Sequence, residues 1–148
     1  LGGNGYVEES GMPRLLRDSP LNSIWEGSGN VAALDVLRAM AKEPEGLPAF
    51  LDEVKLASGA DARLDAHVAR LEQRIGGLAT EDPQWQARRI VEDLGLALQG
   101  SLLVRHAPPA VADAFCASRL TAGAHGYAFG SLPAGVDADA ILARAIAA

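Results

Sequence analysis

The segment Asp-Ala-Arg-Leu-Asp-Ala-His-Val-Ala-Arg-Leu-Glu-Gln-Arg-Ile-Gly-Gly occupies residues 61–77 and indicates the structural class of the chain. Its apolar residues recur at intervals of four, three and four, the spacing of one helix face, at Leu64, Val68, Leu71 and Ile75. Asp61 is a suitable N-cap, and the glycine pair after Ile75 closes the pattern. The spacing therefore predicts a helix over 61–75 with one buried face.

Four other segments show helical signals. Each carries aliphatic residues at helical spacing and follows a proline or an N-cap residue, and the predicted helices cover 48–57, 83–105, 109–122 and 137–147. Gly95 and Gly100 each cost their helix up to ~1 kcal/mol relative to alanine. We interpret both as points where a neighbouring helix approaches closely. Trp85 is predicted to pack at an edge of the bundle, with base stacking as the alternative.

Composition also favours helices. Of 148 residues, 49% are hydrophobic but only 5% are aromatic, and alanine and leucine outnumber β-branched residues. The net charge of −6 argues against a general nucleic-acid coat protein. Cys116 is the single cysteine, which permits no internal disulfide, suits a reducing cytoplasm and is expected near the core. No apolar run approaches the ~20 residues of a membrane span. We expect a cytoplasmic, all-α helical bundle of about five to six helices.

The N-terminal third differs from this bundle. A helical pattern begins at Val31, and Pro44 is the first of several helix-breaking residues that end it. This composition break divides the chain into two expected parts, 1–43 and 44–148. Residues 1–30 have no sustained period, so the bundle is preceded by an irregular glycine-rich segment. Because the sequence opens within that segment, we expect a C-terminal fragment of a larger protein.

One carboxylate occupies an unusual position. Glu26 lies in Ile-Trp-Glu-Gly-Ser-Gly-Asn, residues 24–30, on a turn just before the helix that begins at Val31. Ser28 and Asn30 are both good N-cap residues for that helix. A carboxylate on such a turn is a candidate proton acceptor. The alternative is an ordinary helix start, since acidic residues are common in first turns for reasons of stability.

A row of basic residues follows the helix predicted over 61–75. Arg63, His67, Arg70 and Arg74 are again spaced four, three and four residues apart. Such a row suits contact with phosphates, but acidic residues between them favour a solvated, mixed-charge face. The three histidines of the chain are scattered and suggest no metal site.

Three motifs in the first thirty residues resemble the C-terminal signature of the acyl-CoA dehydrogenase family. They are Gly-Gly-Asn-Gly-Tyr at 2–6, Pro-Arg-Leu-Leu-Arg-Asp at 13–18 and the segment at 24–30. Their order and spacing are those of the family. Trp25, Ser28 to Asn30 and the long C-terminal extension most resemble its AidB-type branch, the isovaleryl-CoA dehydrogenase-like proteins of the DNA alkylation response.

The resemblance implies a role for each matched position. Glu26 would be the base that removes the α-proton of an acyl-CoA thioester, and it would bind the substrate together with Gly27. FAD would accept the hydride, with contacts to Ser28 and Asn30. A glycine loop would lie against the FAD of a neighbouring subunit in a homotetramer, at Gly2, Gly3 and Gly5. Because most of the flavin-binding parts are absent, the fragment alone is expected to be inactive.

The same resemblance offers another function for the whole protein. It would be a DNA-associated protective flavoprotein with weak or vestigial dehydrogenase activity. Residues 45–148 contain nine Lys or Arg and thirteen Asp or Glu, so any DNA contact would need a local patch. The candidate patch consists of Arg63, Arg70, Arg74, Arg88 and Arg89. A third interpretation is that the extension serves only for packing or oligomerisation.

Overall fold

The computed structural model describes residues 2–25, 27–78, 82–121 and 132–145, and these form helices. The α-helices are α1 (Met12–Asp18), α2 (Gly29–Lys42), α3 (Gly46–Lys55), α4 (Ala62–Gly77), α5 (Pro83–His106), α6 (Pro109–Phe115) and α7 (Ala138–Ala145). Short 3₁₀ turns cover Gly2–Gly5, Glu8–Ser10 and Ser19–Ser23, and a π-helical turn covers Cys116–Leu120. Within the described ranges there is no β-strand. The all-α prediction is confirmed.

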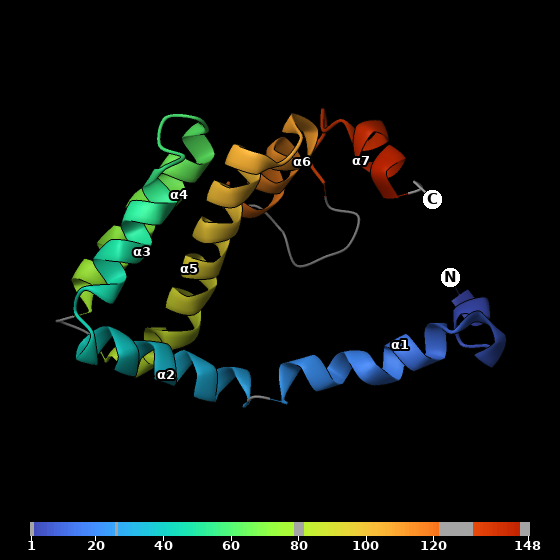
Figure 1. The fold of residues 1–148 in the computed structure, drawn as a ribbon, viewed down its shortest axis with the longest axis horizontal. Helices are drawn as coiled ribbons and strands as arrows, with labels where there is room; N and C mark the ends of the chain where they lie inside the picture. The colour runs from blue at the N-terminus through green and yellow to red at the C-terminus, as the bar shows by residue number, and fades with distance from the viewer. Residues whose placement is uncertain (1, 26, 79–81, 122–131, 146–148) are drawn as a thin grey trace.

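Helix α5 is the centre of the arrangement. Helices α2, α3, α4 and α6 all pack against it. In Figure 1, α3, α4 and α5 lie alongside one another, and α2 crosses them at one end. The π-helical turn after α6 closes the other end by packing against α4 and α5. The bundle therefore begins with α2 and is organised around one long helix.

Residues 2–25 form an arm outside this bundle. Figure 1 shows α1 roughly continuing the line of α2, away from α3 and α5. Of the arm's described residues only Pro13 is buried. Large apolar side chains remain exposed along it, including Leu15, Leu16, Leu21, Ile24 and Trp25. None of the described helices combines the length and the apolar character needed to cross a membrane.

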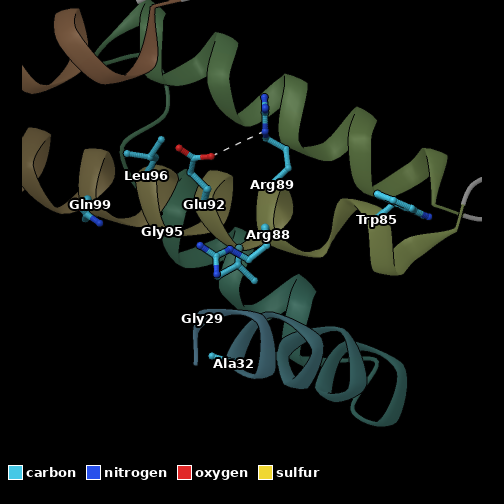
Figure 2. Close-up of a pocket in the computed structure, with 10 residues that line it drawn as sticks. Gly29, Ala32, Trp85, Arg88, Arg89, Glu92, Gly95, Leu96 and Gln99 are labelled. Atoms are coloured by element: carbon cyan, nitrogen blue, oxygen red, sulfur yellow. Dashed lines mark ion pairs between the residues drawn. The ribbon is translucent and has the colours of Figure 1, made fainter. Parts of the chain in front are cut away.

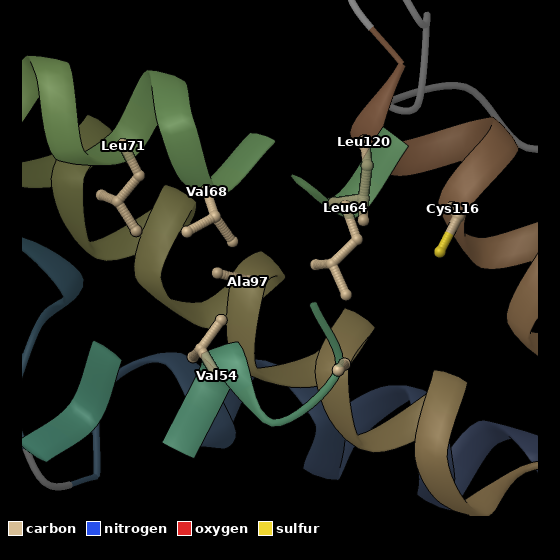
Figure 3. Packing of buried hydrophobic residues seen from close by; sticks show 8 residues of the cluster. Val54, Leu64, Val68, Leu71, Ala97, Cys116 and Leu120 are labelled. Carbon is tan, nitrogen blue, oxygen red and sulfur yellow. The ribbon is translucent and has the colours of Figure 1, made fainter. Parts of the chain in front are cut away.

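The core forms where α3, α4 and α5 meet the π-helical turn. Leu64, Val68 and Leu71 of the predicted stripe are buried, whereas Ile75 is only partly buried against the cluster. Figure 3 shows the same cluster with its other labelled members, Val54, Ala97, Cys116 and Leu120. Cys116 is fully buried and free, as expected, and burial raises the pKa of its thiol to about 11.

The two glycines of α5 have different surroundings. A Cβ added to Gly100 would lie 3.0 Å from a methyl carbon of Leu64 and 3.0 Å from one of Leu120. The predicted close approach is therefore confirmed at Gly100. At Gly95 the prediction is wrong, because the nearest atom to an added Cβ is 3.9 Å away and belongs to Gln99 of the same helix. Gly95 borders an open cleft instead.

Asp61 caps α4 and binds Arg63, which joins α4 to α6. Its carboxylate accepts from the backbone N–H groups of Arg63 and Leu64, at 2.8 Å and 3.3 Å. The Arg63 guanidinium donates to Asp61 Oδ2 at 2.6 Å and to Asp113 Oδ1 at 2.8 Å. The hydrogen bond from the Arg63 side chain is the largest reason why the pKa of Asp61 falls from 3.8 to about 2.

We expect Asp61→Ala to lower the free energy of unfolding by roughly 1–2 kcal/mol, a usual cost for a lost helix cap. Asp61→Asn keeps a capping oxygen and should cost less. Because folding depresses the pKa of Asp61, its ionic contribution is fully present above pH 3.8 and is lost as pH falls towards 2. Urea unfolding of the wild-type protein and both variants, at neutral pH and at a pH between 2 and 3.8, measures these differences in the free energy of unfolding. If Asp61→Asn lowered the free energy of unfolding equally at both pH values, the expected ionic contribution would be contradicted.

Candidate functional site

The turn before α2 contains the predicted catalytic segment. Glu26 lies outside the described residues, while Trp25 and Gly27 on either side are described. Gly27 has a φ of 115°, in a region that side chains strongly disfavour. A Cβ there would meet only ordinary contacts with Val31. Backbone conformation, not space, therefore requires glycine directly after Glu26.

Ser28 is the N-cap of α2, as its residue type predicted. Its backbone is extended, with φ −66° and ψ 155°, and its carbonyl accepts from the N–H of Ala32 at 3.1 Å. Its side chain makes no capping hydrogen bond. The Ser28 hydroxyl consequently remains available at the start of α2, beside Gly27.

Asn30 is hydrogen-bonded by a residue of the C-terminal extension. The Arg88 guanidinium of α5 donates from Nη1 to Asn30 Oδ1 at 3.3 Å. The same guanidinium packs against Gly29, where an added Cβ would lie 2.3 Å from Nη1. The sequence contained no signal for this contact, because its partners are 58 residues apart.

An open cleft of about 870 Å³ lies between the start of α2 and α5. We call it the α2–α5 cleft, and it is lined by Gly29, Ala32, Trp85, Arg88, Arg89, Val91, Glu92, Gly95, Leu96 and Gln99. Figure 2 shows Arg88 between α5 and the start of α2, with Trp85 further along α5. Trp85 is 86% exposed. The prediction that it packs at the bundle edge is wrong, because its side chain is almost entirely exposed.

The predicted glycine loop lies elsewhere. Gly2, Gly3 and Gly5 form the first 3₁₀ turn at the N-terminal end of the arm, and Figure 1 shows this end far from the start of α2. Nothing lies within 4 Å of a Cβ built on Gly2 or Gly3, and Gly2 has a φ of 58°. The chain alone therefore does not bring the glycine loop together with Ser28 and Asn30.

The candidate arginine patch is divided and largely paired. Arg63, Arg70 and Arg74 lie on α4, whereas Arg88 and Arg89 line the α2–α5 cleft. Arg70 donates to the carbonyl of Leu120 at 2.8 Å. Carboxylates engage three others, since Arg63 bonds Asp61 and Asp113, Arg74 bonds Asp93 at 3.0 Å, and Arg89 lies 3.9 Å from Glu92.

His67 differs from the expectation of a solvated row. It is buried, and its Nε2 lies 2.9 Å from the carbonyl oxygen of Asp93 on α5. The contact replaces water with a protein partner for the imidazole, so His67 joins α4 to α5. Among the described residues, no three His, Cys, Asp or Glu side chains come together as a metal site.

Comparison with known proteins places these features in a family context. Residues 1–41 match the family described as "Acyl-CoA dehydrogenase, C-terminal domain". The Escherichia coli (strain K12) protein "Putative acyl-CoA dehydrogenase AidB" is 43% identical over 117 residues, which is 78% of this chain and 21% of that protein. "Acyl-CoA dehydrogenase family member 11" of Caenorhabditis elegans is 34% identical over 110 residues, 74% of this chain and 15% of that protein.

These matches extend past the family signature. Because more than 100 residues align in each relative, the similarity continues beyond residue 41 into the helices of the bundle. The chain spans about a fifth of the length of the bacterial relative and about a seventh of the nematode one. The bundle is therefore similar to a segment of both longer proteins.

Proposed function

We propose that the protein acts as part of an FAD-dependent acyl-CoA dehydrogenase, because residues 1–41 match the C-terminal domain of that family. The reaction is α,β-dehydrogenation of an acyl-CoA thioester, and the chain by itself is inactive. The family match carries the proposal, together with the turn at 27–30 that follows Glu26. Residues 1–43 supply the end of the catalytic helical domain, and residues 44–148 form its helical extension.

Two features at the start of α2 support a contact with a flavin. The Ser28 hydroxyl makes no capping bond, and Asn30 has an amide at the same helix end. Open space beside Gly2 and Gly3 would allow another molecule close to the backbone. In this proposal Gly2, Gly3 and Gly5 lie against the FAD of a neighbouring subunit in a cytoplasmic homotetramer.

Glu26 is the proposed base. Its carboxylate would take the proton from the substrate α-carbon, and its own backbone N–H would hydrogen-bond the thioester carbonyl. Polarising that carbonyl acidifies the α-carbon as negative charge develops. Bound FAD supplies the hydride acceptor. The positive φ of Gly27 supports this role, because it sets the backbone direction directly after the base.

The test uses the longer protein that contains this chain. It is purified and checked for bound FAD, and flavin bleaching is recorded without oxygen against short, branched and long acyl-CoAs. Rapid bleaching by one class would support the proposal and identify the substrate. A flavin-loaded protein that no acyl-CoA reduces would count against it.

The second candidate is a DNA-associated protective flavoprotein, favoured by one observation. Exposed Trp85 lies on the α2–α5 cleft together with Arg88 and Arg89. An aromatic ring stacks on bases, and neighbouring cations attract phosphates. The acidic chain can hold DNA only through such a local surface.

For this candidate we expect DNA affinity to fall with salt and to weaken on Trp85→Ala, by roughly fivefold or more from the loss of one stacked base. Arg89→Ala should reduce the slope of log affinity against log salt concentration by about one, the contribution of one phosphate contact. Fluorescence anisotropy with a labelled oligonucleotide over a salt series measures both. Arg144→Ala on α7 is the matched control. Salt-independent binding, or an equal effect of the control, would exclude this surface.

A further inference from the structure

The contact between Arg88 and Asn30 joins the extension to the predicted flavin turn. Arg88 belongs to α5, in the extension, whereas Asn30 lies in the first turn of α2. Their side chains meet through Nη1 and Oδ1 at 3.3 Å, and Gly29 leaves room for the guanidinium beside them. Figure 2 shows Arg88 reaching from α5 to the start of α2.

This contact does not have the character of a stabilising pair. Arg88 is exposed, and Asn30, a neutral amide, is the one described side chain to which it is bonded. The N-terminal end of a helix carries a partial positive charge, so a cation beside it is electrostatically unfavourable. Helix stability alone therefore does not explain an arginine at this place.

The bond sets the orientation of the Asn30 amide. Because Oδ1 accepts from Arg88, the Nδ2 group is the free end of the side chain, and Nδ2 can only donate. Without Arg88, the amide could turn and present its oxygen instead. Arg88 thus selects whether Asn30 offers a donor or an acceptor at the start of α2.

We propose that Arg88 is a positioning residue, which holds Asn30 as a hydrogen-bond donor towards the flavin. The inference rests on the proposed function. It assigns the extension a role at the flavin site, through one arginine.

The first test measures the FAD dissociation constant of the longer protein by flavin fluorescence. Arg88→Gln should weaken FAD about fivefold, the size expected for one coupled hydrogen bond. Arg88→Lys should restore part of the affinity. Arg88→Gln should add nothing to Asn30→Ala, because both variants remove the same interaction. Arg144→Gln on α7 is the matched control and should leave the affinity unchanged within about twofold. Additive effects of Arg88→Gln and Asn30→Ala would overturn the inference, as would unchanged affinity for Arg88→Gln.

The second test separates this inference from the proposed function. NMR of the flavin-free protein follows the chemical shifts of the Asn30 side-chain NH₂ group, which the bond to Arg88 orients. Arg88→Gln should shift these signals, whereas Arg144→Gln on α7 should not. Wild-type protein that binds no FAD would overturn the proposed function. Unchanged Asn30 side-chain signals in Arg88→Gln would independently overturn the inference that Arg88 positions this amide.

Discussion

Glu26→Gln in the longer protein should abolish flavin bleaching by its best acyl-CoA substrate. Glutamine has nearly the same shape but cannot take the α-proton, and a positioned base contributes roughly 10²–10⁴-fold to a rate. We expect the rate constant of bleaching to fall by that factor. Stopped-flow absorbance under anaerobic conditions measures it.

Binding should survive this change. The backbone N–H of residue 26 remains, so the variant should still bind FAD and acyl-CoA with near wild-type affinity. Glu9→Gln, an exposed glutamate of the arm, is the matched control and should bleach at the wild-type rate. Bleaching by Glu26→Gln at more than about a tenth of the wild-type rate would remove Glu26 from the role of base.

Leu71→Ala should cause the largest loss of stability that we predict. Leu71 is 0% exposed at the centre of the core between α3, α4 and α5. Truncation there loses the transfer free energy of the side chain and leaves a cavity, which together cost about 2–5 kcal/mol. This is a large part of the ~5–15 kcal/mol that stabilises an ordinary domain. Urea unfolding followed by circular dichroism measures the change.

The control is the same substitution at an exposed leucine. Leu56, just after α3, is 64% exposed, so Leu56→Ala should change stability by less than about 0.5 kcal/mol. A similar loss for the two variants would mean that Leu71 does not lie in a tightly packed core. The comparison holds residue type constant and varies only burial.

Local pattern was sufficient for the helices. The predicted helix over 61–75 is observed as Ala62–Gly77, and the one over 83–105 as Pro83–His106. Both begin at an aspartate whose side chain accepts from the first-turn backbone. α3 begins at Gly46, two residues earlier than predicted. Caps are encoded by neighbouring residues, so the sequence reveals them directly.

The end of the bundle was predicted less closely. The helix expected over 109–122 is α-helical only to Phe115 and continues as the π-helical turn, which buries Cys116 and Leu120. The last helix begins after Asp137, which caps it as predicted by accepting from the N–H of Ala140 at 3.0 Å. Residues 122–131, between these two helices, lie outside the described residues. The change from α-helical to π-helical geometry depends on tertiary packing, which the spacing of apolar residues does not reveal.

Contacts between distant residues could not be predicted. Burial of His67 depends on the carbonyl of Asp93, and exposure of Trp85 depends on which helices end near it. Neither follows from periodicity. The candidate catalytic segment was recognisable because its residues are consecutive. Its connection to Arg88 was not, because α5 returns to α2 only in the folded chain.

The continuity of helix α2 determines which insertions and deletions the protein can tolerate. Ser28 caps its start and Asn30 lies in its first turn, while its later residues pack against α3 and α5. One continuous helix therefore sets the orientation of Ser28 and Asn30 relative to the bundle. Removing a single residue from α2 would rotate its start by about 100° relative to the bundle and shift it by about 1.5 Å. Asn30 would then face away from Arg88. Insertions at Glu43–Glu45, between α2 and α3, leave the orientation set by α2 intact, so natural length variation should gather there and spare α2.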